Sequence, residues 1–240
     1  MMTPLHLALV LSLLAGLSMA VGAVLAAREH IVRDWLEKEV RHAVIAFGGG
    51  ALLAAVALVL VPEGARHHNA VSATVLFVGG GLVFMLVDRA LAARGGALSQ
   101  LLAMLLDFVP EAIALGAALA LGGKQALLLA FLIGLQNLPE GFNAFREMRN
   151  NPDSTLSAGK IILTFAGLAL LGPLSAALGF VVLADMPYLL GAIMLFASGG
   201  ILYLVFQDIA PQVPLKAHWA PPLGAVSGFA LGLVGHLLVH

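Results

Sequence analysis

The stretch "LIGLQNLPEGFNAF", Leu132 to Phe145, decides how this chain folds. Its flanks are strongly apolar, yet Gln136, Asn137, Pro139 and Glu140 fall within five positions of one another. A charge at the centre of a bilayer is unfavourable by about 3 kcal/mol or more unless it is paired or hydrated. We therefore expect this polar patch to face the interior of a membrane protein, where it is a candidate for function.

The composition of the whole chain indicates the same class of protein. Of its 240 residues, 61% are hydrophobic and only 10% are charged, with a mean hydropathy of +1.02. A soluble domain of this size needs a more charged surface, so we expect the lipid bilayer to surround it. The net charge of -1 gives no reason to expect a nucleic-acid partner. The absence of cysteine excludes disulfides, thiolate metal sites and cysteine catalysis.

Apolar runs of about 20 residues predict the membrane-spanning helices. The first run has no basic residue before it and is followed by others, so we interpret it as a spanning helix rather than a cleaved signal peptide. The connections are short, and no separate soluble domain is present. The sequence predicts an all-α polytopic membrane protein, with residues 1–240 forming a single transmembrane domain. Its eight helices are expected at 4–27, 43–62, 70–92, 98–121, 125–146, 160–184, 187–209 and 220–239.

The distribution of basic residues predicts the orientation. Ten of the twelve lysines and arginines fall in the first, third, fifth and seventh connections, and only Arg66 and Lys124 fall on the other side. Connections rich in lysine and arginine stay in the cytoplasm. We therefore expect a multi-pass protein of the cell (inner) membrane with both termini outside the cytoplasm, which agrees with an even number of helices.

Two of the predicted helices share a sequence pattern. "FGGGALLAAVALVLVP" (Phe47–Pro62) and "FASGGILYLVFQDIAP" (Phe196–Pro211) have the same residue at five of sixteen aligned positions. They lie on the second and seventh helices, which run in opposite directions in the predicted topology. Inverted repeats of this kind are common in transporters. The pattern predicts an inverted repeat of helices 1–3 and 6–8 around helices 4 and 5.

Helices 4 and 5 carry the same polar pattern, polar-x-x-Pro-Glu, near the middle of each span. In helix 4 the polar residues are Asp107 and Glu111, and in helix 5 they are Gln136 and Glu140. Residues four apart lie on one face of a helix. Three carboxylates at one depth would repel each other, and a bound cation would relieve both the repulsion and the cost of burial.

The prolines of the two patterns fit a cation site as well. Pro110 and Pro139 each lack an N–H, which leaves the carbonyls of Leu106 and Leu135 free to line a cavity or approach an ion. A single proline is more often a simple kink, and a lone amide more often hydrogen-bonds between helices. Two copies on consecutive helices at matching depth favour an ion site.

Four segments together resemble the ZIP (Zrt/Irt-like) family of divalent metal transporters, as a divergent member of the bacterial type. They are "AFGGGALLAAVALVLVPEG" in helix 2, "DFVPEAIALG" in helix 4, "QNLPEG" in helix 5 and "LFASGGILYLVFQDIAP" in helix 7. The resemblance implies an elevator-like or rocking transporter, often a homodimer, that moves zinc, iron, manganese or similar ions into the cytoplasm. It maps the metal-binding positions onto Asp107, Glu111, Gln136, Asn137 and Glu140.

The chain departs from the family pattern at the site itself. The family usually has His where this chain has Asp107, often His at Gln136, and Asn or a related residue at Phe108. A Glu that is common near Pro173 is replaced here by the sequence around Gly172. These departures argue against a two-metal site. Without imidazole, oxygen ligands suit manganese, magnesium, calcium or ferrous iron comparatively better than zinc.

Our sequence-based hypothesis is therefore one metal ion, held by Asp107, Glu111, Gln136 and Glu140 with Asn137 beside it. The ion is the substrate, which leaves zinc, iron, manganese and cadmium open, and no organic cofactor is implied.

Two further groups of polar residues lie at the ends of the predicted helices. At the outer face, an acceptor funnel for cations would use His6, Glu63, His67 and His68. At the inner face, an ion could be released to Asp88, Gln207 and Asp208. The alternative for each is that it solvates a helix end, or, for Asp88, that it pairs with Arg89.

Other functions stay open at this point. The same carboxylates could serve a proton- or other cation-coupled carrier, or the chain could be a transport-deficient membrane metal sensor or scaffold. An enzyme is not expected, because neither H-E-x-x-H nor the Gly-x-Gly-Asp of intramembrane aspartyl proteases occurs.

Overall fold

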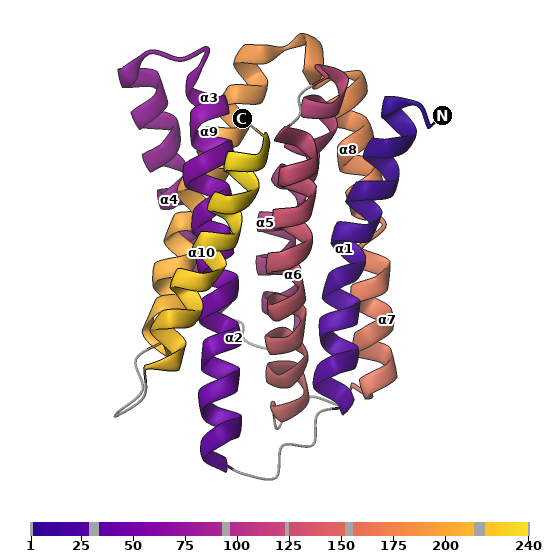
Figure 1. The fold of residues 1–240 in the computed structure, drawn as a ribbon, viewed down its shortest axis with the longest axis vertical. Helices are drawn as coiled ribbons and strands as arrows, with labels where there is room; N and C mark the ends of the chain where they lie inside the picture. Colours follow the sequence, from indigo (N-terminus) through magenta and orange to yellow (C-terminus); the bar gives the residue numbers. More distant parts are fainter. Residues whose placement is uncertain are drawn as a thin grey trace.

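The computed structural model of the chain describes residues 2–28, 34–92, 97–122, 125–151, 156–213 and 219–239. Within these ranges the chain forms helices and their connections, without any strand (Figure 1). Part of the basic-residue bias that predicts the orientation, at 29–33, 93–96 and 214–218, lies outside the described residues. The long helices are α1 (Pro4–Arg28), α2 (Asp34–Ala55), α4 (Ala70–Ala92), α5 (Ala97–Ala120), α6 (Gln125–Asn150), α9 (Pro187–Leu204) and α10 (Ala220–Val239).

Helix covers each of the eight predicted runs. Among the described residues, six stretches are long and apolar enough to cross a membrane: Pro4–Arg28, Glu39–Ala65, Ala70–Ala90, Ala158–Asp185, Pro187–Ile209 and Ala220–Leu238. The other two runs correspond to α5 and α6, which contain the polar patterns. The chain is thus an all-helical protein with several long apolar helices, as a membrane-embedded protein requires, whereas the crossing of α5 and α6 stays a prediction.

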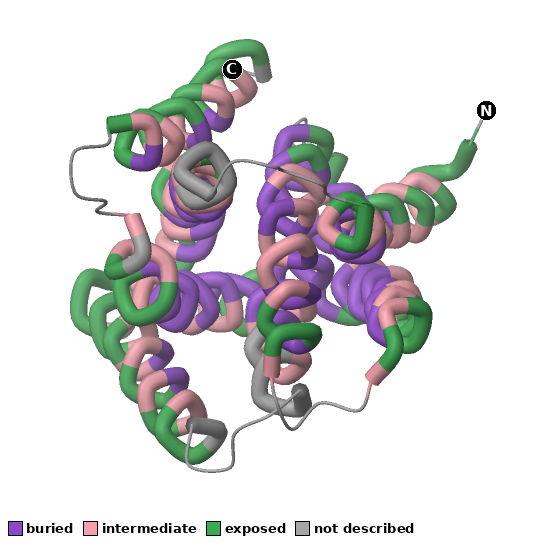
Figure 2. Tube along the Cα trace, turned by 90° about the horizontal axis from the view of Figure 1, so that it is seen from below, coloured by how far each residue is buried: buried purple, intermediate pink, exposed green. Residues whose placement is uncertain are grey.

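The outward faces of the peripheral helices are apolar. Figure 2 shows buried residues toward the middle of the molecule and exposed ones around its rim. Large apolar side chains stand on this rim, such as Val71 at 74% and Leu238 at 82% exposure. A soluble monomer rarely exposes so much contiguous apolar surface, so this rim fits contact with lipid tails.

Four pairs of helices pack with their backbones in close contact: α1 with α6, α5 with α8 (Leu171–Val181), α2 with α10, and α4 with α9. In each pair, a glycine on either helix lies so near a carbonyl oxygen of the other that a Cβ atom would collide with it. The glycine and carbonyl partners are Gly22 with Leu138, Gly141 with Met19, Gly116 with Ala176, Gly179 with Ile113, Gly50 with Ala225, Gly228 with Phe47, Gly80 with Phe196, and Gly199 with Phe77. Small residues of this kind let membrane helices approach closely.

The helices form two groups. The α1 group contains α1, α5, α6, α8 and α7 (Ala158–Leu168), and the α2 group contains α2, α4, α9, α10 and the short α3 (Val61–Ala65). The two groups touch mainly where α2 meets α6 and where α5 meets α9. At the first of these contacts, a Cβ atom on Gly48 would lie 2.8 Å from Cγ of Pro139. The ring of this proline therefore packs directly on the backbone of α2.

Helices 2 and 7 of the prediction each contain one turn of π-helix. These turns are η1 (Val56–Leu60), which leads into α3, and η3 (Val205–Ile209), which leads into the 3-10 turn η4 (Ala210–Gln212). Each begins nine residues after the Phe of the shared sequence pattern, from 47 to 56 and from 196 to 205. A π-turn inserts a residue into a helix and is frequent at functional sites.

The sixth predicted helix differs from expectation, since it is broken into α7 and α8 before a 3-10 turn, η2 (Leu183–Asp185). The break lies at Ala169 and Leu170. Pro173 has no N–H to bond the carbonyl of Ala169, and this carbonyl instead accepts from the N–H of Gly172 at 3.1 Å. By contrast, Pro110 and Pro139 lie inside the continuous helices α5 and α6. Whether the carbonyls of Leu106 and Leu135 open at these prolines stays a prediction.

The first and last helices end on the same side of the molecule. The start of α1 and the end of α10 both lie at the upper end in Figure 1, whereas α2 begins at the lower end. This arrangement agrees with an even number of passes.

Candidate functional site

The centre of the polar patch is a contact between α5 and α6. The side-chain nitrogen of Gln136 donates to both carboxylate oxygens of Glu111, at 2.7 Å to Oε1 and 2.6 Å to Oε2. Glu111 is completely buried and Gln136 is 2% exposed. Hydrogen bonds to a charged group contribute about 1.5–3 kcal/mol each, so this pair offsets part of the cost of burying the carboxylate.

Asp107 and Glu140 lie one helical turn away from this contact, on the same side of it. Asp107 precedes Glu111 by four residues on α5, and Glu140 follows Gln136 by four residues on α6. Because the two helices are consecutive and antiparallel, both steps lead toward the end where α5 starts and α6 ends. Consistent with this, Asp107 interacts electrostatically with Glu140 most strongly and with Glu111 next. The acids therefore form two layers rather than one.

Several buried oxygens at the site have no hydrogen-bond partner among the described residues. They include Oδ1 of Asp107, Oε1 of Gln136 and Oδ1 of Asn143. An unpaired buried oxygen costs free energy, and a cation would satisfy it. Within the described ranges, however, no three side chains of the His, Cys, Asp and Glu types are grouped closely enough to hold a metal on their own. The carboxylates alone therefore do not form a complete coordination shell, and further donors would have to contribute.

Asn137 points away from this contact. Its side-chain nitrogen donates to the carbonyl oxygen of Ala15 on α1 at 2.9 Å, and the residue is completely buried. Since Gln136 and Asn137 are adjacent, they face different sides of α6. The structure brings Asp107, Glu111, Gln136 and Glu140 together, and it uses Asn137 to hold α6 against α1.

Phe108 fills the space beside the site. This completely buried ring has its Cζ atom 2.7 Å from the position of a Cβ atom on Gly16, and equally close to one on Gly172. Phe108 follows Asp107 directly, so the ring lies where a second polar side chain of α5 would otherwise extend toward α1 and α8. The two glycines leave room for the phenyl ring, which therefore packs against the backbones of both helices.

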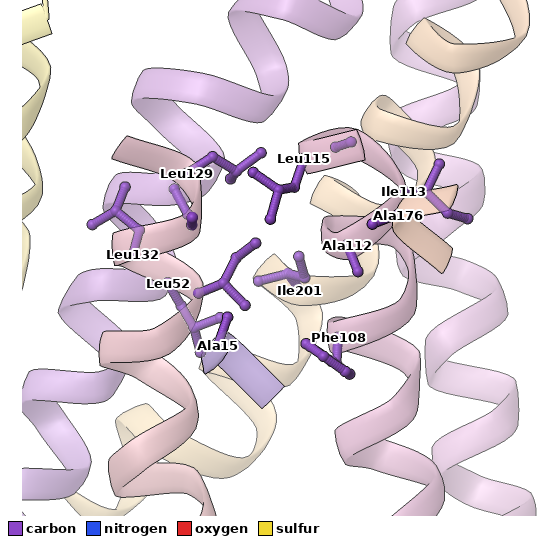
Figure 3. Close-up of a cluster of buried hydrophobic side chains, with 14 of the residues drawn as sticks. Ala15, Leu52, Phe108, Ala112, Ile113, Leu115, Leu129, Leu132, Ala176 and Ile201 are labelled. Carbon is purple, nitrogen blue, oxygen red and sulfur yellow. The ribbon is translucent and has the colours of Figure 1, made fainter. Parts of the chain in front are cut away.

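Apolar side chains close the site on the side opposite to Asp107 and Glu140. Leu115 and Leu132 lie one turn from Glu111 and Gln136 in that direction, and both are completely buried. Figure 3 shows them with Leu129, Leu52 of α2 and Ile201 of α9 in one apolar cluster. The candidate site is thus sealed by leucines on one side and continued by carboxylates on the other.

The carboxylate side leads to further polar residues at the lower end of the molecule. Asp208, in the π-turn η3, interacts electrostatically with Asp107 and with Asp88. The hydroxyl of Tyr203 donates to Asp88 at 3.0 Å, and the alternative of an ion pair between Asp88 and Arg89 stays a prediction. Gln207, beside Asp208, is exposed.

Sequence reasoning missed two polar residues on α6. Asn143 and Glu147 continue the face that starts at Gln136 and Glu140, with spacings of four, three and four residues. Glu147 interacts electrostatically with Arg41 of α2 and with Asp208. The helical period of these polar residues was the signal that could have identified them.

Three residues of the predicted funnel have local partners. The ring of His6 hydrogen-bonds the hydroxyl of Thr3 at 2.5 Å, on α1. Glu63 forms an ion pair with Arg66 at 2.9 Å. Nε2 of His68 lies 3.0 Å from the carbonyl oxygen of Tyr188, and the two rings are in contact at an interplanar angle of 57°.

His67 is exposed beside them. Because α1 and α3 lie on opposite sides in Figure 1, His6 is separated from the other three funnel residues. The structure thus groups Glu63, His67 and His68 at the end of α3 and does not bring His6 to them.

A scan against protein-family models found no matching family, and a search of curated proteins found no matching sequence. What the fold and the site define is therefore the class: an all-helical protein with long apolar helices, built around a buried carboxylate–amide cluster.

Proposed function

We propose that this protein transports divalent metal cations across the membrane into the cytoplasm and that it is a divergent member of the ZIP family. The observation that carries the proposal is the buried contact of Glu111 with Gln136, together with Asp107 and Glu140 one turn away. Intramembrane carboxylates are costly, and where they occur they mark ion pathways. Asp107 and Glu111 are buried among apolar side chains and Glu140 is half-buried beside them, where a purely structural role would not require carboxylates.

The donor chemistry favours a single ion held by oxygen. Asp107, Glu111 and Glu140 provide carboxylate oxygens, and the amide of Gln136 lies beside them. Such a set suits manganese or ferrous iron better than zinc, and it also accepts cadmium and zinc. The Phe108 ring between Gly16 and Gly172 supports one ion rather than two.

An inverted repeat supports a transporter with alternating access. Exchanging helices 1–3 with 6–8 and helix 4 with 5 converts the α1–α6 contact into the α5–α8 contact, and the α2–α10 contact into the α4–α9 contact. The residues that make these contacts are offset by a constant number of positions between the two repeats. From α1 to α8 the offset is 157 residues, both from Gly22 to Gly179 and from Met19 to Ala176. From α5 to α6 it is 25 residues, both from Ile113 to Leu138 and from Gly116 to Gly141. The matching π-turns η1 and η3 add to this support.

The asymmetry of the site supports the direction of transport. Under the predicted orientation, the leucine side (Leu115, Leu132) faces outward and the carboxylate side (Asp107, Glu140) faces the cytoplasm. An ion at this site would therefore exchange with the cytoplasm. Movement of the α1 group along the α2 group would carry the site to the outer side, as in elevator-like transport.

Equilibrium binding to the purified protein tests the site. Titration with Mn²⁺, Zn²⁺, Fe²⁺ and Cd²⁺ should show one ion per chain, and Asp107→Asn, Glu111→Gln and Glu140→Gln should each weaken binding at least tenfold. Glu63→Gln is the matched control, because Glu63 is a carboxylate in an ion pair at the outer end and should leave the central site unaffected. Undiminished binding in all three site variants would refute the proposal.

Two alternative functions predict different results for the same purified protein. A metal sensor would bind ions with this stoichiometry and would not conduct them in vesicles. A carrier of protons or monovalent cations would conduct these ions without binding divalent metals. Flux measurements in proteoliposomes therefore separate the three.

A further inference from the structure

The Gln136 amide occupies the chelating position of the Glu111 carboxylate. Its nitrogen lies at nearly equal distances from the two carboxylate oxygens, 2.7 and 2.6 Å. A carboxylate only accepts hydrogen bonds, so the group that faces it must be the NH₂ end of the amide. A cation that is to be bound by both oxygens of Glu111 needs the same position.

We propose that Gln136 is a displaceable stand-in for the cation: its amide stabilises the Glu111 carboxylate by hydrogen bonding and must leave before an ion can be bound. This inference rests on the proposed function and concerns how the site admits its ion. It gives Gln136 a different role from that of a simple metal ligand, because its nitrogen cannot coordinate a cation.

The surroundings of the amide are consistent with this role. Oε1 of Gln136 is buried without a hydrogen-bond partner among the described residues, so the amide is held in place through its nitrogen alone. No second acceptor or donor fixes the orientation of the side chain. Glu111, by contrast, is completely buried and has this amide as its hydrogen-bond donor.

The consequence is a threshold for ion binding. An incoming ion gains the carboxylate only after two charge-assisted hydrogen bonds are broken, so an ion with weak affinity for carboxylate does not displace the amide. Divalent ions interact with a carboxylate more strongly than monovalent ions, since the Coulomb energy grows with charge. Gln136 would thereby select divalent over monovalent cations.

The sign of an affinity change tests the proposal. Gln136→Met keeps the length of the side chain and removes both its donor and its acceptor. If the amide competes with the ion, Gln136→Met binds Mn²⁺ and Cd²⁺ at least tenfold more tightly than the wild type at pH 8, where protons compete least for Glu111. Na⁺ or K⁺ at 100 mM (roughly physiological ionic strength) then inhibits binding in the variant more than in the wild type. Weaker Mn²⁺ binding by the variant would overturn the proposal and leave Gln136 as an ordinary ligand.

Asn137→Leu is the matched control, because this neighbouring amide donates to a backbone carbonyl rather than to a carboxylate. We expect it to lower thermal stability without tightening metal binding. If the wild type binds no divalent ion at all, the proposed function fails, which is a different outcome from failure of the stand-in.

A second measurement does not depend on the folding of a variant. In wild-type protein labelled with ¹⁵N-glutamine, the side-chain signal of Gln136 should shift when Cd²⁺ saturates the site. An unchanged signal at saturating Cd²⁺ would contradict displacement of the amide.

Discussion

At the scale of single residues, the carboxylate of Glu111 is the group on which the site depends. It is completely buried, and its hydrogen-bond donor is a neutral amide, so its negative charge is only partly compensated. A divalent cation compensates this charge in full. Asp107 and Glu140, one turn away, add charge on the cytoplasmic side in the predicted orientation, and they make the site increasingly attractive to cations from that direction.

The first prediction concerns the Phe108 ring. Gly16→Leu should destabilise the protein by about 1–3 kcal/mol, because even a Cβ atom would lie 2.7 Å from Phe108 Cζ and 2.9 Å from Cα of Ala169. Thermal unfolding in detergent measures the effect. Restored stability in the double variant Gly16→Leu, Phe108→Ala would support direct contact. Equal destabilisation in the single and double variants would contradict it.

At the scale of helices, the close backbone contacts set which elements are neighbours. A carbonyl oxygen sits where the Cβ of Gly141 would be, and another where the Cβ of Gly116 would be. Gly79 and Gly159, in contrast, have nothing within 4 Å of a Cβ position. The same substitution should therefore lower stability strongly at the first kind of glycine and change it little at the second.

We predict that Gly141→Val and Gly116→Val each lower stability by about 1–3 kcal/mol or prevent folding, since the α1–α6 and α5–α8 pairs cannot separate without losing their packing. Gly79→Val and Gly159→Val should change it by less than about 0.5 kcal/mol. Thermal stability and elution from size-exclusion chromatography provide the comparison. Equal loss at all four positions would contradict the role of these contacts, because valine has a higher helix propensity than glycine and the loss could not be assigned to the helix backbone either.

The sequence predicted the helices better than their pairing. The eight apolar runs and the Asp107–Glu111 and Gln136–Glu140 patterns are local signals, and local signals are visible along one chain. The pairing was not visible, because aligning the two polar patterns at a spacing of 29 residues matches Glu111 with Glu140. The equivalent glycine contacts of α5 and α6 are instead 25 residues apart. This offset matches Glu111 with Gln136, which lies one helical turn before Glu140.

Other features depend on tertiary contact and leave no local pattern. At Ala169 the helix breaks because Pro173 cannot donate a hydrogen bond to the Ala169 carbonyl, which accepts from Gly172 instead. A proline alone does not determine a break, since α5 and α6 continue through Pro110 and Pro139. The direction of the Asn137 side chain toward the Ala15 carbonyl depends on how α1 packs. The π-turn that carries Asp208 likewise has no simple residue signature.

At the scale of the whole molecule, uptake of metal ions into the cytoplasm requires a defined orientation of the protein in the membrane. The chain contains no cysteine, so single introduced cysteines can be labelled without background. His67→Cys lies beside α3 and Asn150→Cys lies at the end of α6, and both positions are exposed. We predict that an impermeant maleimide labels His67→Cys in intact cells and labels Asn150→Cys only after the membrane is permeabilised. The reverse pattern would contradict the predicted orientation and the direction of uptake.

The two groups of helices give the transport proposal its mechanical basis. Within each group, backbones approach closely at glycines, and the two groups meet mainly where α2 packs on α6 and where α5 packs on α9. The candidate site belongs wholly to the α1 group, since Asp107, Glu111, Gln136 and Glu140 all lie on α5 and α6. A movement between the groups would therefore carry the whole site without taking it apart.

The most direct measurement of the central claim is divalent-metal flux into proteoliposomes, with the double variant Glu111→Gln, Glu140→Gln beside the wild type. We predict that the wild type conducts at least one of Mn²⁺, Fe²⁺, Zn²⁺ and Cd²⁺. The folded double variant should show no flux of these ions above that of vesicles without protein. Equal flux through the wild type and the double variant would contradict the account, as would the absence of flux for every ion through correctly folded wild-type protein.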